Sequence, residues 1–140
     1  MKNSNMRWLI AAAALAVAAG SASAQTFKAE IPLAFRAGTT QMAPGAYQID
    51  MLKSNTNVTL ARVMNLDTNK AVLVVAPADY NTAIKSKSEG KAVIDFSCSE
   101  GRCSLARLWD GRGEFTYKFA TPRKHEAQVA TISVPITKAE

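Results

Sequence analysis

The chain has 140 residues, of which 17 are Lys or Arg and 11 are Asp or Glu, and its net charge is +6. This length fits one domain with a hydrophobic core of its own. The basic residues are spread along the chain, whereas nucleic-acid binding requires a concentrated basic stripe. Composition and charge therefore argue against a nucleic-acid-binding function.

The first 24 residues have the pattern of a secretory signal peptide. Lys2 and Arg7 form a positively charged start, and an alanine-rich apolar run follows over residues 8–19. The small residues Ala22-Ser23-Ala24 then match the site behind which a signal peptidase cleaves. The apolar run is shorter than the roughly 20 residues that span a membrane, so we interpret it as a cleaved leader.

Cleavage after Ala24 separates a signal peptide, residues 1–24, from a single β-rich domain, residues 25–140. The mature domain has no further apolar segment of membrane-spanning length. We expect it to be periplasmic or extracellular. Its two cysteines would then meet an oxidising environment.

Period-two alternation of apolar residues, typical of half-buried strands, dominates this domain. In FKAEIPLAF, residues 27–35, every second side chain from Phe27 onward is apolar. Pro32 has no N–H to donate, so we expect an edge strand or a bulge there. AYQIDML, residues 46–52, predicts the next strand. Gly38 and the Pro44-Gly45 pair predict turns between the two strands, the second of type II.

Residues 57–65 and 70–77 predict a hairpin, because two apolar strand patterns flank the turn-rich segment LDTNK. The second strand contains VLVV, residues 72–75. Such a continuous apolar run indicates a strand that is buried on both faces or central in a sheet. The polar stretch 79–91 has weak periodicity and is expected to be a surface loop.

The only two cysteines, Cys98 and Cys103, lie between two further strand patterns, AVIDFSC and CSLARLW. A structural zinc site takes about four ligands, and the chain adds only one histidine to this pair. Redox couples usually have the spacing C-x-x-C at the start of a helix. We therefore predict a disulfide across a β-hairpin.

Pairing Cys98 with Cys103 also fixes an expected register for the hairpin. The loop would be the four residues 99–102, and Phe96 would face Leu105. Three further pairs follow from this register: Ile94 with Arg107, Ala92 with Trp109, and Asp95 with Ala106.

The last part of the chain predicts a turn at DGRG, residues 110–113, and strands at 114–120 and 129–136 with a polar segment between them. In total, about eight strands joined by short turns predict an all-β fold. Either an antiparallel β-sandwich or a small barrel satisfies this pattern.

Residues with catalytic potential are few and scattered. His125 is the only imidazole, and Asp110 and Glu114 flank the DGRG turn, where two carboxylates could converge. Asp95 lies between apolar neighbours, so its burial would call for a partner such as Arg107 or Arg62. No nucleotide-binding, hydrolase or metalloprotease motif occurs. We therefore predict no catalytic residue, no metal site and no cofactor.

Four aromatic residues gather in the carboxyl-terminal half: Trp109, Phe115, Tyr117 and Phe119. An exposed aromatic row on a β-scaffold can bind a sugar or a hydrophobic ligand, whereas a buried row belongs to the core. Their alternating spacing favours the core. A ligand-facing row is the alternative.

The segment IPLAFRAGTTQMAPGAYQI resembles the start of a group of small exported bacterial proteins of unassigned function. In that group a signal peptide is followed by a strand like Ile31–Phe35 and then by a Pro-x-Gly-x-Tyr-like segment, here Met42–Tyr47. The likeness continues through CSLARLWDGRGEF. The cysteine pair and the strands TYKFA and VATISVPI are departures. The resemblance implies a β-rich fold and export, and it implies no catalytic residues.

These observations favour a non-enzymatic binding or envelope-associated domain. One alternative is a carrier of a small hydrophobic ligand with a lipocalin-like cavity. Another is a cell-surface assembly subunit that pairs through its proline-marked edge strands. A hydrolase using Asp110, Glu114 or His125 is the enzymatic alternative, and it requires these side chains to converge in one cleft.

Overall fold

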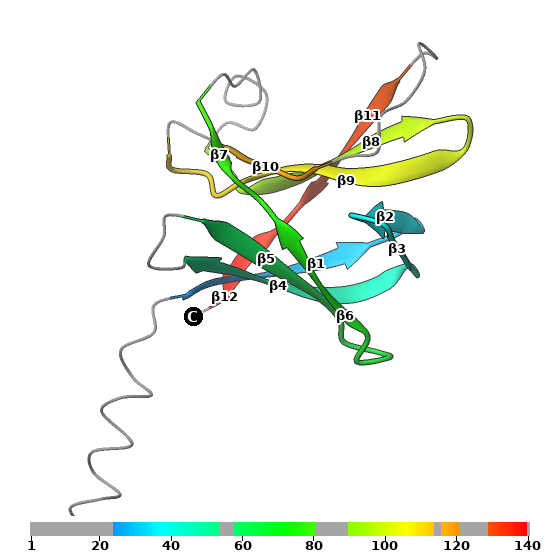
Figure 1. The fold of residues 1–140 in the computed structure, drawn as a ribbon, viewed down its shortest axis with the longest axis horizontal. Coiled ribbons are helices and arrows are strands. Elements are labelled where there is room, and N and C mark those ends of the chain that lie inside the picture. The colour runs from blue at the N-terminus through cyan, green and yellow to red at the C-terminus, as the bar shows by residue number, and fades with distance from the viewer. Residues whose placement is uncertain (1–23, 54–57, 81–89, 114–115, 121–128, 140) are drawn as a thin grey trace, which may run out of the picture.

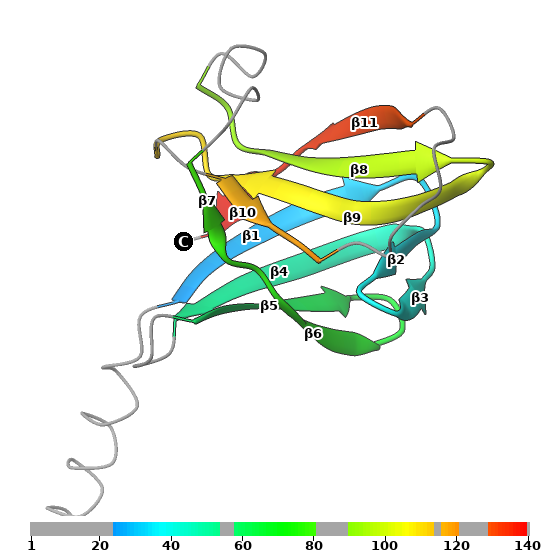
Figure 2. The same ribbon diagram turned by 45° about the horizontal axis from the view of Figure 1, so that its top comes forward.

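The computed structural model describes residues 24–53, 58–80, 90–113, 116–120 and 129–139. Every regular element within these ranges is a β-strand, and the strands form two open sheets packed face to face (Figures 1 and 2). The all-β sandwich is thus confirmed, and the barrel alternative is wrong. The predicted signal peptide lies outside the described residues except for its last position, Ala24.

The first sheet contains five strands in the order β12-β1-β4-β5-β6, all antiparallel to their neighbours. Their bounds are β1 Ala24–Ile31, β4 Gly45–Lys53, β5 Thr59–Asn65, β6 Ala71–Val75 and β12 Thr137–Ala139. The predicted hairpin of residues 57–65 and 70–77 is confirmed as β5 and β6.

The second sheet contains seven strands, five of them in the order β11-β8-β9-β10-β7. A short β2–β3 hairpin joins this sheet where β2 runs parallel to β9. The bounds are β2 Phe35–Ala37, β3 Thr40–Met42, β7 Ala78–Asp79, β8 Val93–Ser99, β9 Arg102–Trp109, β10 Thr116–Lys118 and β11 Ala130–Pro135.

The chain changes sheet four times within the described residues, and a proline lies at each change. Pro32 lies between β1 and β2, Pro44 between β3 and β4, Pro77 between β6 and β7, and Pro135 at the end of β11 before β12. Proline has no N–H for a sheet ladder, and Pro32, Pro44 and Pro77 lie just beyond the end of a strand. Pro135 is still paired with Val93, and Ile136 N donates to Ala92 O one residue further on. The expected edge or bulge at Pro32 is therefore wrong, because β1 ends at Ile31 and pairs with both β12 and β4.

The expected type II turn at Pro44-Gly45 also takes another form. Gly45 has a φ of 150° and is already the first residue of β4, whereas a type II turn needs about +80° at this position. A Cβ added at Gly45 would lie 2.7 Å from Asp67 Oδ2. Residues that carry a Cβ rarely adopt this φ, and the close approach of the Asp67 side chain also favours glycine here.

The core lies between the two sheets and is centred on Phe35. The Phe35 ring contacts Tyr47 of the first sheet at a centroid distance of 5.2 Å and Phe96 of the second at 5.1 Å, both edge to face. Phe27 and Ile31 from the predicted amphipathic segment are also buried. Edge-to-face contacts of this kind stabilise beyond the area they bury, so Phe35 ties the two sheets together.

The β8–β9 hairpin confirms the predicted disulfide, because Cys98 lies opposite Cys103 and the two are bonded. Its turn is shorter than expected, since Ser99 and Arg102 also pair. The turn residues Glu100 and Gly101 have φ values of 54° and 75°. Positive φ at both positions is typical of the two-residue type I′ turn that suits twisted hairpins.

Beyond the cysteines the expected register holds only in part. Phe96 lies opposite Leu105 as predicted, but a bulge follows between Asp95 and Phe96. The pairs beyond it are corrected as follows: Asp95 with Arg107, Ile94 with Leu108, and Val93 with Trp109. Leu105 and Leu108 are three residues apart, and a regular strand would send them to opposite faces. The bulge lets both be buried.

We expect the Cys98→Ser/Cys103→Ser double variant to fold with a free energy of unfolding about 2 kcal/mol lower, because the bond closes a short loop. Chemical denaturation of both proteins with and without reductant measures this difference. Reductant should lower the stability of the wild type to that of the variant and leave the variant unchanged. Free thiols in the wild type purified without reductant would contradict the disulfide.

Candidate functional site

Strand β6 lies at a different place in its sheet from the one that the sequence predicted. The VLVV run was expected to be buried on both faces or central, but β6 is the last strand of its sheet. Val74 faces the core, whereas Leu73 is 60% exposed and Val75 is 51% exposed. The signal that identifies this edge is Pro77, which diverts the chain to the other sheet directly after β6.

The hydrogen bonds to β5 show which backbone groups of β6 point outward. Asn65 N donates to Lys70 O and Ala76 N donates to Thr59 O, each at 2.9 Å. In an antiparallel pair, such bonded residues alternate with residues whose N–H and C=O point away. Lys70, Val72, Val74 and Ala76 therefore face β5, and Ala71, Leu73 and Val75 direct their main-chain groups to the outer edge.

The sheet edges at β12, β11 and β7 carry features that normally prevent pairing with a foreign strand. Within the described residues, β12 is three residues long and includes exposed Lys138. β11 ends in Pro135, and β7 consists of two residues, one of them Asp79. By contrast, β6 has five residues, no charge, no proline and an unbroken register with β5.

Apolar side chains extend from this edge over the outer face of the first sheet. Val75 lies opposite Leu60, which in turn lies opposite Leu52 of β4. Val58, just before β5, is 42% exposed. We call Val58, Leu60, Leu73 and Val75 the β6 patch. Contiguous exposed apolar surface is a mark of interaction sites.

The same face carries a polar network beside the patch. Asp50 is 4% exposed, although it lies on the outer face of the sheet. Its Oδ1 accepts a hydrogen bond from Thr26 Oγ1 at 2.7 Å, and its Oδ2 accepts two from the Arg62 guanidinium at 2.6 and 3.0 Å. Gln48 Nε2 donates to both oxygens.

This network changes the pKa of the Asp50 carboxyl. Burial alone would raise the pKa, but the hydrogen bonds from Thr26, Arg62 and Gln48 and the charge of Arg62 outweigh it and hold the pKa below its ordinary value. Asp50 and Arg62 are therefore paired charges. The oxygens of Asp50 are therefore occupied by hydrogen bonds within the protein. The adjacent β6 patch is the part of this face that exposes apolar side chains to solvent.

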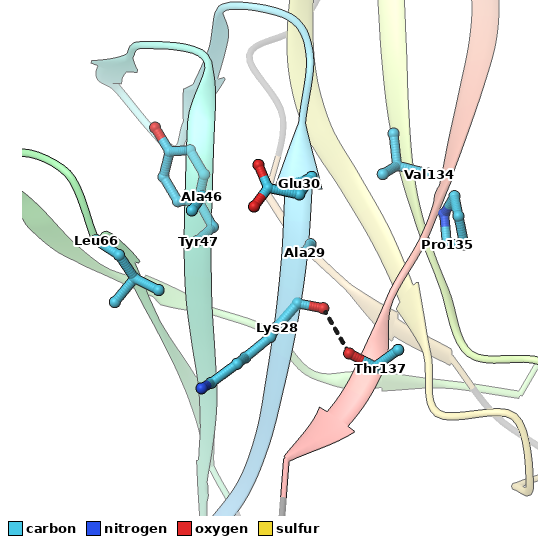
Figure 3. Close-up of a pocket in the computed structure, with 9 residues that line it drawn as sticks. All are labelled: Lys28, Ala29, Glu30, Ala46, Tyr47, Leu66, Val134, Pro135 and Thr137. Atoms are coloured by element: carbon cyan, nitrogen blue, oxygen red, sulfur yellow. Dashed lines mark hydrogen bonds between the residues drawn. The ribbon is translucent and has the colours of Figure 1, made fainter.

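Two surface hollows of about 440 and 460 Å³ border Tyr47 on its two sides. Figure 3 shows the first, with β1 in its centre, Leu66 on one side and Pro135 on the other. Exposed residues such as Lys28 and Glu30 line it, and Thr137 Oγ1 donates to Lys28 O at 3.4 Å at its border. These hollows open to the surface, unlike the interior cavity that a lipocalin-like carrier requires.

The aromatic residues singled out in the sequence lie in different places. Trp109, Tyr117 and Phe119 are each at most 4% exposed, and Phe115 is outside the described residues. Trp109 Nε1 donates to Gly113 O at 3.0 Å. Burial, and to a smaller extent the charge of Asp110, raises the pKa of the Tyr117 phenol. Tyr117 and Phe119 belong to the hydrophobic core cluster, whereas Trp109 is buried outside it.

The carboxylates considered for catalysis have structural contacts. Asp110 Oδ1 accepts hydrogen bonds from the N–H groups of Arg112 and Gly113, each at 3.0 Å, which closes its own turn. Asp95 is buried and accepts a hydrogen bond from Ser133 Oγ at 2.6 Å, while Arg62 pairs with Asp50 instead. Glu114 and His125 are outside the described residues. Among the residues described, no cluster of three His, Cys, Asp or Glu could hold a metal.

No protein-family model, curated protein or solved structure matches the chain. In the part of the chain that the structure describes, no helix has the length and apolar character to cross a membrane. Function is therefore inferred from the sandwich itself and from the surface that it presents at β6.

We expect the free energy of unfolding to fall as the pH drops below about 4, partly because of Asp50. Its folded pKa lies below the unfolded value of 3.8, so its contribution is present above that value and is lost as the pH falls through the folded pKa. Asp50→Asn should flatten this part of the pH profile measured by urea denaturation. Glu30→Gln, a change at an exposed position on the same face of the sheet, is the control. An unchanged profile in Asp50→Asn would reject the network.

Amide hydrogen exchange tests the orientation of the β6 backbone. In dilute protein we expect fast exchange at Ala71, Leu73 and Val75, whose N–H groups face outward, and slow exchange at Val72 and Val74, which bond to β5. NMR measures each amide separately. Equal protection of both sets at low concentration would show that the edge is covered by the chain itself.

Proposed function

We propose that the chain is an exported, non-enzymatic binding domain that receives a partner polypeptide by strand addition at β6. The observation that carries this proposal is the unprotected edge formed by Ala71, Leu73 and Val75. Strand addition supplies affinity through main-chain hydrogen bonds and specificity through alternate side chains. The edge of β6 supplies the main-chain groups for such hydrogen bonds, and the adjoining β6 patch supplies the side chains.

Export is supported by two independent features of the chain. Residues 1–24 have the signal-peptide pattern, and the Cys98–Cys103 disulfide fits an oxidising compartment. The resemblance to small exported bacterial proteins agrees with both. A periplasmic or extracellular location is therefore part of the proposal.

Binding, rather than catalysis, is supported by the roles of the polar side chains. The Asp110 carboxylate closes its own turn, and Asp50 is saturated by its neighbours. A catalytic group must have a free atom aimed at a substrate. At β6, by contrast, the exposed groups are apolar side chains and outward-facing main-chain groups.

Site-specific photo-crosslinking tests the proposal. In bacterial cells that export the full chain, p-benzoylphenylalanine in place of Leu73 is expected to give a discrete covalent adduct, because a partner strand would lie beside this residue. The matched control places the same group at Ile132, which is 40% exposed on β11 of the other sheet. The mass of the adduct identifies the partner.

The chain within the adduct is expected to begin at Gln25 and to be recovered outside the cytoplasm. Absence of a discrete adduct at Leu73, or equal labelling from Ile132, would reject β6 as the binding surface. An adduct formed by unprocessed chain in the cytoplasm would reject export.

A further inference from the structure

We infer that the partner that fits β6 is a second copy of this chain, with the two β6 strands paired antiparallel about a two-fold axis at Leu73. This inference rests on the proposed function, since it names the partner for the same edge. It follows from the symmetry of the edge, from its side chains and from the charges around it.

The outward backbone groups are arranged symmetrically. Ala71, Leu73 and Val75 direct N–H and C=O away from β5, and Leu73 is their midpoint. About a two-fold axis at Leu73, each Leu73 faces its counterpart and each Ala71 faces a Val75 of the second copy. Each of these pairs exchanges two hydrogen bonds. The continuous β5–β6 register, without a bulge, keeps the strand regular over the whole segment.

The side chains of the edge also suit their own copy. An interface of this symmetry brings the same patch together from both chains, so the patch must be self-complementary. Ala71, Leu73 and Val75 all project to the outer face. Small Ala71 would lie beside larger Val75, and the two Leu73 side chains would meet at the axis. The patches of the two copies would then join into one apolar surface.

The charged groups near β6 are compatible with contact between two copies. Without Lys2 and Arg7 of the leader, the exported chain has a net charge of +4, so two copies repel unless their contact is free of unpaired cations. Arg62, the neighbour of Leu73 across the sheet, is neutralised by Asp50. Lys70 is held by a hydrogen bond from its Nζ to Gln41 O at 2.9 Å, toward β3. A two-fold contact at β12 would instead bring two copies of Lys138 together.

The contact covers one strand and its neighbouring side chains, which places it among small interfaces. We expect a dissociation constant on the order of micromolar, in keeping with interfaces of this class. The five-stranded sheets of the two copies would become one continuous sheet. The β6 amides of Ala71, Leu73 and Val75 would then gain protection as concentration rises.

Sedimentation of the exported chain from about 1 µM to about 1 mM tests the inference, since this range brackets the expected affinity. The average mass should approach twice that of one chain. Leu73→Lys should raise the dissociation constant by more than about tenfold, because two ammonium groups would meet at the axis. Ile132→Lys, the same kind of change at the β11 edge, should leave it unchanged. Denaturation midpoints confirm that both variants fold.

A charge-swap mixture tests the register itself. Leu73→Lys and Leu73→Glu should each be monomeric alone, and an equimolar mixture should form a mixed dimer, because position 73 faces itself only when the axis passes through it. A chain that stays monomeric to about 1 mM, a dimer that survives Leu73→Lys, or a mixture that stays monomeric would overturn the inference. If the Leu73 photo-adduct then contains a different protein, the proposed function stands without it.

Discussion

The architecture depends on the inability of proline to donate a backbone hydrogen bond. Each of the four described changes of sheet occurs at a proline. Three of these prolines, Pro32, Pro44 and Pro77, lie just beyond the end of a strand, where a missing N–H helps to end the ladder. The change at Pro77 takes two residues: Ala76 N still bonds to Thr59 O of the first sheet, and Pro77 O already accepts from Lys118 N of the second. The repeated crossings bring Phe35 between Tyr47 and Phe96 and so close the core.

The same constraint creates the candidate site. A strand that continued beyond Val75 and turned back in its own sheet would cover the outer side of β6. Pro77 instead sends the chain to β7 in the other sheet, and the outward groups of Leu73 and Val75 remain at the border of the first sheet. The exposed edge is therefore a direct consequence of how the sandwich is built.

Sequence reasoning succeeded where a structure depends on neighbours along the chain. Alternation located β4, the β5–β6 hairpin and the cysteine-linked β8–β9 hairpin. It failed where the outcome depends on distant segments. The pattern of VLVV is the same for a central strand and for an edge strand, and only the path of the chain after Pro77 distinguishes them. The prediction at Pro32 was wrong for a related reason. A residue without a backbone N–H fits an edge strand and the end of a strand at a change of sheet equally well.

The partners of buried polar residues were equally hidden from the sequence. Arg62 was a candidate partner for Asp95, yet the register of β4 with β5 sets it opposite Asp50. Asp95 meets Ser133 from β11, 38 residues away. The bulge beside Asp95 could have been inferred from the spacing of Leu105 and Leu108. Its effect on every later pair shows how one inserted residue changes a register.

An unprotected edge strand is a liability, because any extended chain can add to it. Pairing of two β6 strands resolves this liability, since each copy covers the edge of the other. The sheet that results would end on both sides at β12, where Lys138 and the short strand discourage further addition. Growth would thus stop at two copies. The β6 edge lacks the protective features that the β12, β11 and β7 edges have. A closed, two-fold assembly needs one such unprotected edge in each chain.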